Sequence, residues 1–164
     1  MYKVGIITCS DKGSSGERED ISAGIIKELV AGINGEVLDY IIIPDEREVI
    51  KDKLIEFADV KKLDLIFTTG GTGFSPRDVT PEATLSVVDR LVPGIPELMR
   101  REGYRVTSRA VLSRAAAGIR KRTLIINLPG SPKAVRENMG WILEALPHGL
   151  DILKGTVSEC ARQG

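Results

Sequence analysis

The sequence contains a single histidine and two cysteines, which restricts the chemistry open to this chain. With His148 as the only imidazole, a histidine-based triad or a zinc site built on histidines is strongly disfavoured, and we interpret His148 as a helix-end or packing residue. Cys9 and Cys160 lie near opposite ends of the chain, outside any metal-type spacing. We expect two reduced thiols rather than a disulfide, although the spacing alone leaves the disulfide open.

Net charge and long apolar runs are also missing. The 23 basic and 23 acidic residues cancel, whereas a nucleic-acid-binding protein usually carries a basic excess. No apolar run approaches the roughly 20 residues of a membrane span. The opening stretch "MYKVGIITCSD" resembles a strand more than a signal peptide. We therefore expect one cytoplasmic domain over residues 1–164, with neither nucleic-acid nor membrane partners.

Apolar strand-like runs alternate with helical patterns along the chain. Strands are predicted at residues 3–9, 36–43, 63–69 and 123–128. Helices are predicted to begin near residues 21, 45, 80, 96 and 132, and the helix from residue 80 to end at 92–94. The segment 104–122 permits either a short strand or a small-residue turn. This alternation predicts an α/β fold, a three-layer α/β/α sandwich whose mostly parallel sheet is covered on both faces.

The turns after the predicted strands are rich in glycines, hydroxyls and carboxylates. They cover residues 10–20, 44–46, 70–78 and 129–131. Parallel strands all end at the same edge of a sheet, which is where ligands bind in open α/β folds. We therefore expect these turns to meet and to form one ligand site.

The glycine-rich turn suits a phosphate group. Gly70, Gly71 and Gly73 allow the backbone N–H groups to approach a ligand, and helix starts at Thr80 and Ser131 add the positive ends of two helix dipoles. A tight turn would explain one glycine pair, but two glycine-bearing turns before capped helices favour an anion site. Neither the dinucleotide-binding nor the P-loop fingerprint is present.

Two aspartates near this phosphate site indicate a cation. Asp45 and Asp78 would repel a phosphate unless a metal lay between them, and Mg²⁺ bridges carboxylates to phosphates. The simpler interpretation is that each aspartate precedes or caps a helix. Arg77 and Lys133 are candidates for direct phosphate contacts, or else solvated surface residues. The pattern alone predicts a Mg²⁺-dependent phosphoryl or nucleotidyl transferase.

The motifs resemble those of a known family. "TTGGTGFSPRDVTPEAT", with "IIIPDE" upstream and "INLPGSPKAV" downstream, resembles the Mog-type molybdopterin adenylyltransferases, which are similar to the G domains of gephyrin and of plant Cnx proteins. The resemblance extends to "EDISAG" near the start of the chain and to "ALPHGLDIL" near its end. It therefore covers nearly the whole chain.

The resemblance implies an activity and a set of site residues. The terminal phosphate of molybdopterin would attack the α-phosphate of Mg-ATP, giving adenylylated molybdopterin and pyrophosphate. Asp45 and Asp78 match the essential aspartates of the family and are the expected catalytic and Mg²⁺-binding residues. The expected substrate-binding residues are Ser10, Asp11, Gly70, Gly71, Thr72, Gly73, Arg77, Thr80, Pro129, Gly130, Ser131 and Lys133. A homo-oligomer is also implied, with trimer or hexamer left open.

Three alternatives remain beside this interpretation. A MoaB-type paralogue binds pterin or nucleotide without adenylylation, but that branch departs at both aspartate motifs, whereas this chain keeps "PDE" and "PRDVTP". A scaffold protein, by analogy with gephyrin, would need linkers and further domains. The later enzyme that inserts molybdate is longer and multidomain. The sequence leaves open molybdenum or tungsten, and whether Ser113 and Arg114 of "LSR" contact the pterin.

Overall fold

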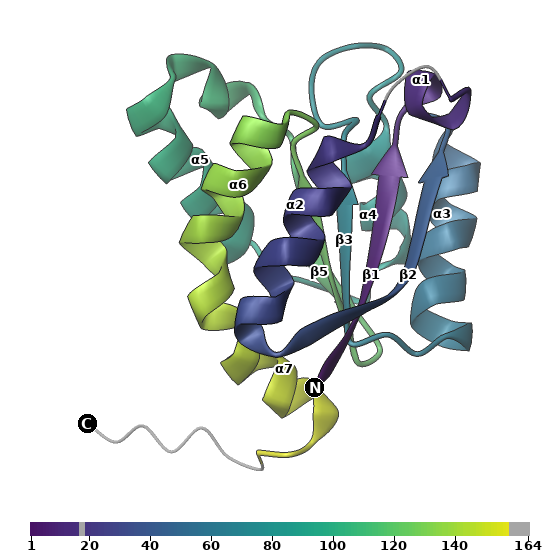
Figure 1. The fold of residues 1–164 in the computed structure, drawn as a ribbon, viewed down its shortest axis with the longest axis vertical. Coiled ribbons are helices and arrows are strands. Elements are labelled where there is room, and N and C mark those ends of the chain that lie inside the picture. Colours follow the sequence, from purple (N-terminus) through teal and green to yellow (C-terminus); the bar gives the residue numbers. More distant parts are fainter. Residues whose placement is uncertain (17–18, 158–164) are drawn as a thin grey trace.

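The computed structural model describes residues 1–16 and 19–157, which form one six-stranded sheet with helices on both faces (Figure 1). The strands are β1 (Tyr2–Cys9), β2 (Gly35–Ile43), β3 (Leu65–Thr69), β4 (Arg90–Leu91), β5 (Ala117–Arg120) and β6 (Thr123–Leu128). Their order across the sheet is β2-β1-β3-β6-β5-β4. The pairs among β2, β1, β3 and β6 are parallel, whereas β5 is antiparallel to both β6 and β4. The predicted mostly parallel sheet is confirmed.

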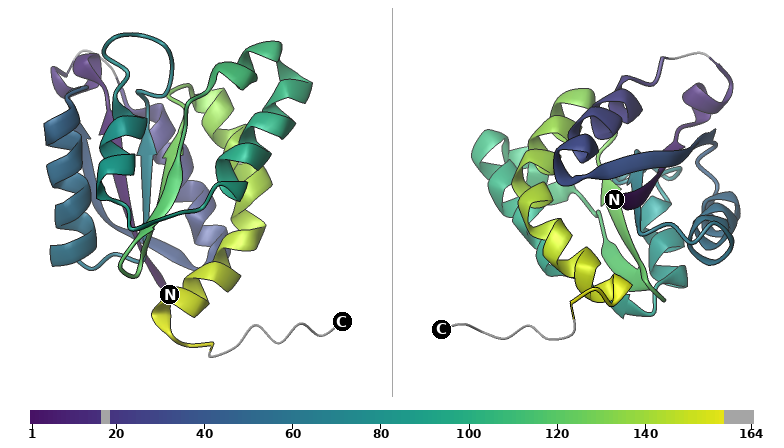
Figure 2. Two further views of the ribbon diagram at one scale, coloured as in Figure 1. Left: turned by 180° about the vertical axis from the view of Figure 1, so that it is seen from behind. Right: turned by 60° about the horizontal axis from the view of Figure 1, so that its bottom comes forward.

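The helices occupy the connections between strands. They are α1 (Asp11–Ser14), α2 (Ile21–Val30), α3 (Arg47–Ile55), α4 (Thr80–Val87), α5 (Gly94–Val106), α6 (Pro132–Ile142) and α7 (Leu146–Lys154). Shorter helical turns are η1 (Ala31–Ile33), the π-helical η2 (Glu56–Val60), η3 (Ser108–Leu112) and η4 (Leu143–Ala145). In Figure 1, α2 and α6 cover the near face of the sheet, and the rear view in Figure 2 shows α3 and α4 on the other.

Two apolar clusters fill the space between the layers. Val4 and Ile6 of β1 belong to the cluster under α2, α6 and α7, while Ile7 and Cys9 belong to the one under α3 and α4. Strand β3 is buried along its whole length. A central parallel strand must be apolar on both faces because helices cover both, which is why these strands are continuous apolar runs in the sequence. The predicted three-layer α/β/α arrangement is confirmed.

Several predicted boundaries are wrong. Asp45 does not open the second long helix: α3 begins at Arg47, its cap position is Glu46, and the Asp45 carboxylate bonds to a neighbouring loop. Thr80 is the first residue of α4 rather than its cap, and its hydroxyl caps nothing. That helix ends early, at Val87, because β4 intervenes before the turn at 92–94.

The segment that the sequence left unassigned holds three elements. It contains the end of α5, which begins at Gly94 rather than near residue 96 and runs to Val106, then η3 and β5. Strand β5 pairs with β6 through a tight hairpin, so the short-strand alternative is correct. The polar loop after β1 also includes the one-turn helix α1, which has no buried residue and so no apolar signal. Cys160 lies outside the described residues; Cys9 is a buried free thiol.

Candidate active site

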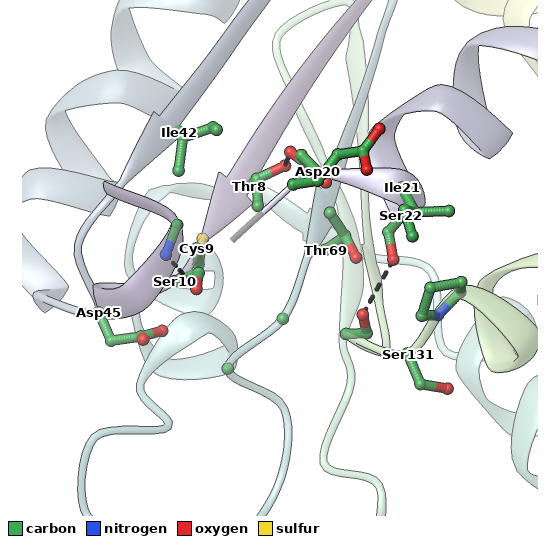
Figure 3. Close-up of a pocket in the computed structure, with 16 residues that line it drawn as sticks. Thr8, Cys9, Ser10, Asp20, Ile21, Ser22, Ile42, Asp45, Thr69 and Ser131 are labelled. Carbon is green, nitrogen blue, oxygen red and sulfur yellow. Dashed lines mark hydrogen bonds between the residues drawn. The ribbon is translucent and has the colours of Figure 1, made fainter. Parts of the chain in front are cut away.

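The turns that leave β1, β2, β3 and β6 meet at one edge of the sheet, at the top of Figure 1. They surround a hollow of about 460 Å³ that is drawn in Figure 3. Its lining residues come from all four turns and from the starts of α2 and α6; they are Thr8, Cys9, Ser10, Gly13, Glu19, Asp20, Ile21, Ser22, Ile42, Asp45, Thr69, Gly70, Gly71, Gly130, Ser131 and Pro132. The expectation that these turns converge is therefore confirmed.

One wall of the hollow is made by the turns after β1 and β2. The Ser10 hydroxyl caps α1 by accepting a bond from Gly13 N at 3.0 Å. Asp11 and Asp45 bond reciprocally, each backbone N–H donating to the other's carboxylate at 3.0 Å. Arg77 donates to both Asp11 oxygens at 3.0 and 2.9 Å. Asp11 therefore holds the Arg77 guanidinium against this wall.

The floor of the hollow is the glycine turn after β3, and it tolerates no side chain. Gly70 and Gly71 have φ values of +96° and +69°, in the left-handed region that glycine prefers. A Cβ on Gly71 would lie 2.3 Å from Thr80 Oγ1, and one on Gly70 would lie 2.4 Å from the carbonyl oxygen of Cys9. A Cβ on Gly130 would lie 3.4 Å from Gly70 Cα, so the two glycine-bearing turns are in contact.

The opposite wall is made by the starts of α2 and α6. Asp20 caps α2 through Ala23 N at 3.1 Å and accepts hydrogen bonds from the hydroxyls of Thr8, at 2.6 Å, and Tyr40. Burial, together with the bond to Asp20, raises the pKa of the Tyr40 hydroxyl. Ser22 Oγ donates to the Gly130 carbonyl at 2.9 Å, facing Asp45 across the hollow in Figure 3.

Sequence reasoning missed Asp20 and Ser22. An acid immediately before a helical apolar pattern is a recognisable cap signal, and it could have identified Asp20. The position of Ser22 depends on a contact between residues 108 apart in the sequence, which no local pattern reveals.

Beneath the floor lie two polar atoms without partners. Asp45 Oδ1 and Thr80 Oγ1 are buried, and neither has a hydrogen-bond partner in the described part of the chain. Both lie beside Gly71, because a Cβ there would approach Asp45 Oδ1 to 3.2 Å. Burial raises the pKa of the Asp45 carboxyl, and the negative charges of Asp11 and Asp78 add to that rise. A buried acceptor without a partner costs free energy, so such atoms commonly mark a ligand site.

Cys9 lies on the same floor but does not supply a nucleophile. Burial raises the pKa of its thiol to about 12; the nearby Thr80 hydroxyl offsets only part of that rise, and the charge of Asp45 adds to it. The reactive form of cysteine is the thiolate. At neutral pH Cys9 is therefore an apolar lining group.

A second hollow of about 420 Å³ lies along the other side of the glycine turn. Its lining includes Thr72, Gly73, Phe74, Arg100, Arg109, Ser113 and Pro129. Asp78 borders this part of the turn: its Oδ2 accepts a bond from Ser75 N at 2.9 Å and would lie 2.9 Å from a Cβ on Gly73. The glycine turn thus borders both hollows.

Thirteen of the fourteen predicted site residues fall into three groups, and Lys133 belongs to none of them. Six line the first hollow: Ser10, Asp45, Gly70, Gly71, Gly130 and Ser131. Three line the second: Thr72, Gly73 and Pro129. Asp11, Arg77, Asp78 and Thr80 support the turns between them. Lys133 lines neither hollow; its side chain is 82% exposed and its amine lies 3.9 Å from Glu137.

The oxygen atoms at this edge fit Mg²⁺ better than a transition metal. Among residues 1–16 and 19–157, no cluster of three or more His, Cys, Asp or Glu residues is arranged to hold a metal. Mg²⁺ does not require such a cluster, because it takes one or two carboxylates and completes its shell with water and substrate phosphate. The unpartnered Asp45 Oδ1 and Thr80 Oγ1, with Asp78 near enough to raise the pKa of Asp45, match that ligand chemistry.

Comparison with known proteins shows to which family the chain belongs. Residues 5–148 match the family model described as "Probable molybdopterin binding domain". The chain belongs to this family. The curated "Molybdopterin adenylyltransferase" of Helicobacter pylori J99 is 42% identical over 154 residues, which are 93% of this chain and 88% of that protein.

Solved members of the molybdopterin-binding family share the fold. The structure of the "Molybdopterin biosynthesis enzyme MoaB" from Thermus thermophilus is 54% identical, with a TM-score of 0.90 over 94% of this chain and 98% of that chain. A structure of MogA is 34% identical, with a TM-score of 0.87 over 92% and 99%. The family resemblance inferred from the motifs is confirmed.

Proposed function

We propose that this chain adenylylates molybdopterin in molybdenum cofactor biosynthesis, with ATP and molybdopterin as substrates. The observation that carries the proposal is the pair of buried, unpartnered oxygen atoms of Asp45 and Thr80 beneath a glycine turn. A buried acceptor without a partner calls for a cation or a donor from a ligand. Mg-ATP supplies a cation for these two oxygen atoms. It also supplies phosphate oxygens that suit the backbone N–H groups of the glycine turn.

The chemistry requires positioning rather than a covalent intermediate. A terminal phosphate oxygen of molybdopterin forms a bond to the α-phosphorus of ATP, and the bond from that phosphorus to the pyrophosphate oxygen breaks. The products are adenylylated molybdopterin and pyrophosphate. Such a transfer depends on aligning the attacking phosphate oxygen with the α-phosphorus and on neutralising the charge of the phosphates. A site with a glycine turn that admits no side chain at Gly70 or Gly71, two aspartates and an inert Cys9 thiol suits that requirement.

We assign Mg²⁺ binding to Asp45 and Asp78, with the Thr80 hydroxyl as a further oxygen ligand. When bound, the cation would neutralise phosphate charge. The glycine turn and the N-termini of α4 and α6 would hold the phosphates, and Arg77 would offset their charge beside Asp11. Two hollows that share one glycine turn suit two substrates that must meet.

The same proposal includes a single domain over 1–164, a cytoplasmic location and a homo-oligomer, either trimeric or hexameric. Every helix within residues 1–16 and 19–157 falls short of the length and apolar character that a membrane span needs. Large apolar side chains lie exposed on α5 and η3, which suits burial against another copy. They are Tyr104, Val106, Val111 and Leu112.

The second candidate is a pterin- or nucleotide-binding paralogue without adenylylation activity. The observation in its favour is the 54% identity to the Thermus structure, which bears the name MoaB. Asp45 lines the first hollow with an unpartnered Oδ1, and Asp78 borders the glycine turn. The presence of both aspartates supports the active enzyme.

A turnover assay separates the two candidates. Purified protein is mixed with molybdopterin, ATP and Mg²⁺, and both adenylylated pterin and pyrophosphate are measured. We expect product that depends on all three components. Nucleotide binding without product would overturn the enzymatic proposal in favour of the binding paralogue.

A further inference from the structure

Arg114 joins both ends of the glycine turn, although it comes from the segment between η3 and β5. Its backbone N–H donates to the Thr72 carbonyl at 3.0 Å. Its Nε donates to the Gly73 carbonyl at 2.8 Å, and its Nη2 donates to the Asp78 carbonyl at 2.7 Å. One residue thus holds three carbonyl oxygens spread over positions 72–78.

The guanidinium is itself held by Glu82, in the first turn of α4. Arg114 Nη1 lies 2.8 and 2.7 Å from the two Glu82 carboxylate oxygens. The two side chains are 34% and 40% exposed, so the pair is partly shielded from water. Because a guanidinium presents several donors in one plane, a carboxylate on one nitrogen fixes the direction of the others. Glu82 therefore orients the donors that reach Gly73 and Asp78.

The glycine turn needs this external support. Gly70 and Gly71 have no side chains with which to pack, and Phe74 is 69% exposed. Within the turn, the Asp78 carboxylate fixes Ser75 N, so the carboxylate and the turn move together. A bond to the backbone carbonyl of Asp78 therefore also limits where its carboxylate can go.

Arg114 lines neither hollow, so it does not meet a ligand from its present position. Its neighbour Ser113 does line the second hollow. Of the "LSR" residues, the arginine therefore faces the glycine turn and the serine faces the hollow. We propose that Arg114, oriented by Glu82, is a positioning residue that holds the glycine turn and Asp78 in the geometry required for nucleotidyl transfer. This inference rests on the proposed function.

A matched control exists at the far end of α4. Arg120 donates from Nε and Nη2 to Asp59 and from Nη1 to the Val87 carbonyl at 2.8 Å. It therefore has the same kinds of partners as Arg114, a carboxylate and a backbone carbonyl, but none of them is in the glycine turn. An Arg120→Lys variant loses comparable bonds without releasing that turn.

The test compares Arg114→Lys with Arg120→Lys. A lysine keeps the charge but cannot bridge several fixed acceptors. For Arg114→Lys we expect kcat to fall by about 10- to 100-fold while the KM for Mg-ATP changes by less than about 3-fold, the pattern of misaligned reactants. Hydrogen–deuterium exchange of peptides covering 70–78 should accelerate in Arg114→Lys and remain at the wild-type rate in Arg120→Lys.

Glu82→Gln provides a second variant if Arg114→Lys does not fold. Glu82→Gln keeps the guanidinium and removes the charge that orients it. Hydrogen–deuterium exchange over 70–78 should therefore accelerate, but less than in Arg114→Lys. Equal losses of kcat in Arg114→Lys and Arg120→Lys, or unchanged exchange in both Arg114→Lys and Glu82→Gln, would overturn the positioning role. If the wild-type protein forms no product, the proposed function fails, and the exchange rates still decide whether Arg114 holds the turn.

Discussion

At the edge of the sheet where the strands begin, Asp59 accepts bonds from Arg120 at 3.0 and 2.7 Å and lies 3.3 Å from Lys121. At the edge where they end, Asp45 Oδ1 is buried and lacks any partner in the described chain. Accordingly, Arg120 lowers the pKa of the Asp59 carboxyl, whereas burial raises that of Asp45. A carboxylate whose oxygens are both hydrogen-bonded stabilises the fold. A carboxylate oxygen without a partner is available to a ligand. Substituting the aspartates should therefore distinguish the two edges: activity should fall at the edge where the strands end, and only stability should change at the edge where they begin.

The largest effect is expected for Asp78→Asn. Removing the carboxylate to which we assign Mg²⁺ binding should lower the turnover of adenylylation by about 10³-fold, the scale for losing a group that stabilises transition-state charge. The Tm should stay close to that of wild type, since an amide oxygen can still accept the bond from Ser75 N. Product formation is measured beside Asp59→Asn, which should keep wild-type turnover. Full activity in a folded Asp78→Asn protein would remove Asp78 from the mechanism.

Asp45→Asn should separate activity from stability. Turnover should fall by about 10²-fold because the unpartnered oxygen no longer carries a charge for the cation. Burial raises the pKa of Asp45 above its ordinary value of 3.8, so the folded state loses stability as pH rises through the folded pKa. The asparagine amide carries no charge and avoids this loss. In EDTA at pH 7, the Tm of Asp45→Asn should therefore exceed that of wild type.

The pH dependence checks this interpretation of Asp45→Asn. Below about pH 3 the Asp45 carboxyl is largely protonated in both the folded and the unfolded state, so the gain in Tm should largely disappear. Added Mg²⁺ should raise the Tm of wild type and leave that of the variant unchanged. A variant less stable than wild type at pH 7 in EDTA would mean that the Asp45 charge serves the fold.

Thr80→Val tests the second unpartnered atom. Valine keeps the shape and removes a buried hydroxyl that has no partner, so the Tm of the free protein should rise by about 2 °C. Affinity for Mg-ATP, measured by calorimetry, should weaken by about tenfold if the hydroxyl bonds to the bound cation or phosphate. Unchanged affinity together with a lower Tm would assign Thr80 to the fold instead.

The sequence was sufficient for the sheet and for the meeting of its turns. Continuous apolar strands alternating with helical patterns require parallel pairing, and parallel pairing alone places the ends of β1, β2, β3 and β6 together. Gly70 and Gly71 were also identifiable, since their left-handed backbone and close contacts both require glycine. These features follow from local residue types and from the rules of chain connection.

The misplaced features depend on contacts between distant segments. Asp45 looked like a helix start, but its carboxylate bonds to Asp11, 34 positions earlier. The side-chain contacts of Arg114 left no local pattern because their partners lie 32 to 41 positions away along the chain. A helix does start at Thr80 as predicted, but the predicted Thr80 cap is wrong, because Val79 takes the cap position and the Thr80 hydroxyl lies against Gly71. Side-chain partners across a fold cannot be deduced from spacing alone.

Asp59→Asn should produce the smallest change, and only in stability. The bond from Arg120 lowers the pKa of the Asp59 carboxyl below its ordinary value of 3.8, so its ionised form stabilises the fold above that pH, and this stabilisation is lost as pH falls through the folded pKa. At pH 7 we expect the Tm to fall by about 3 °C, consistent with a partly exposed bidentate pair. As the pH falls below 3.8 and through the folded pKa, the Tm values of the two proteins should converge, and turnover should match wild type at neutral pH. A loss of turnover comparable to that of Asp45→Asn would mean that the two edges are coupled and that a satisfied carboxylate also serves the reaction.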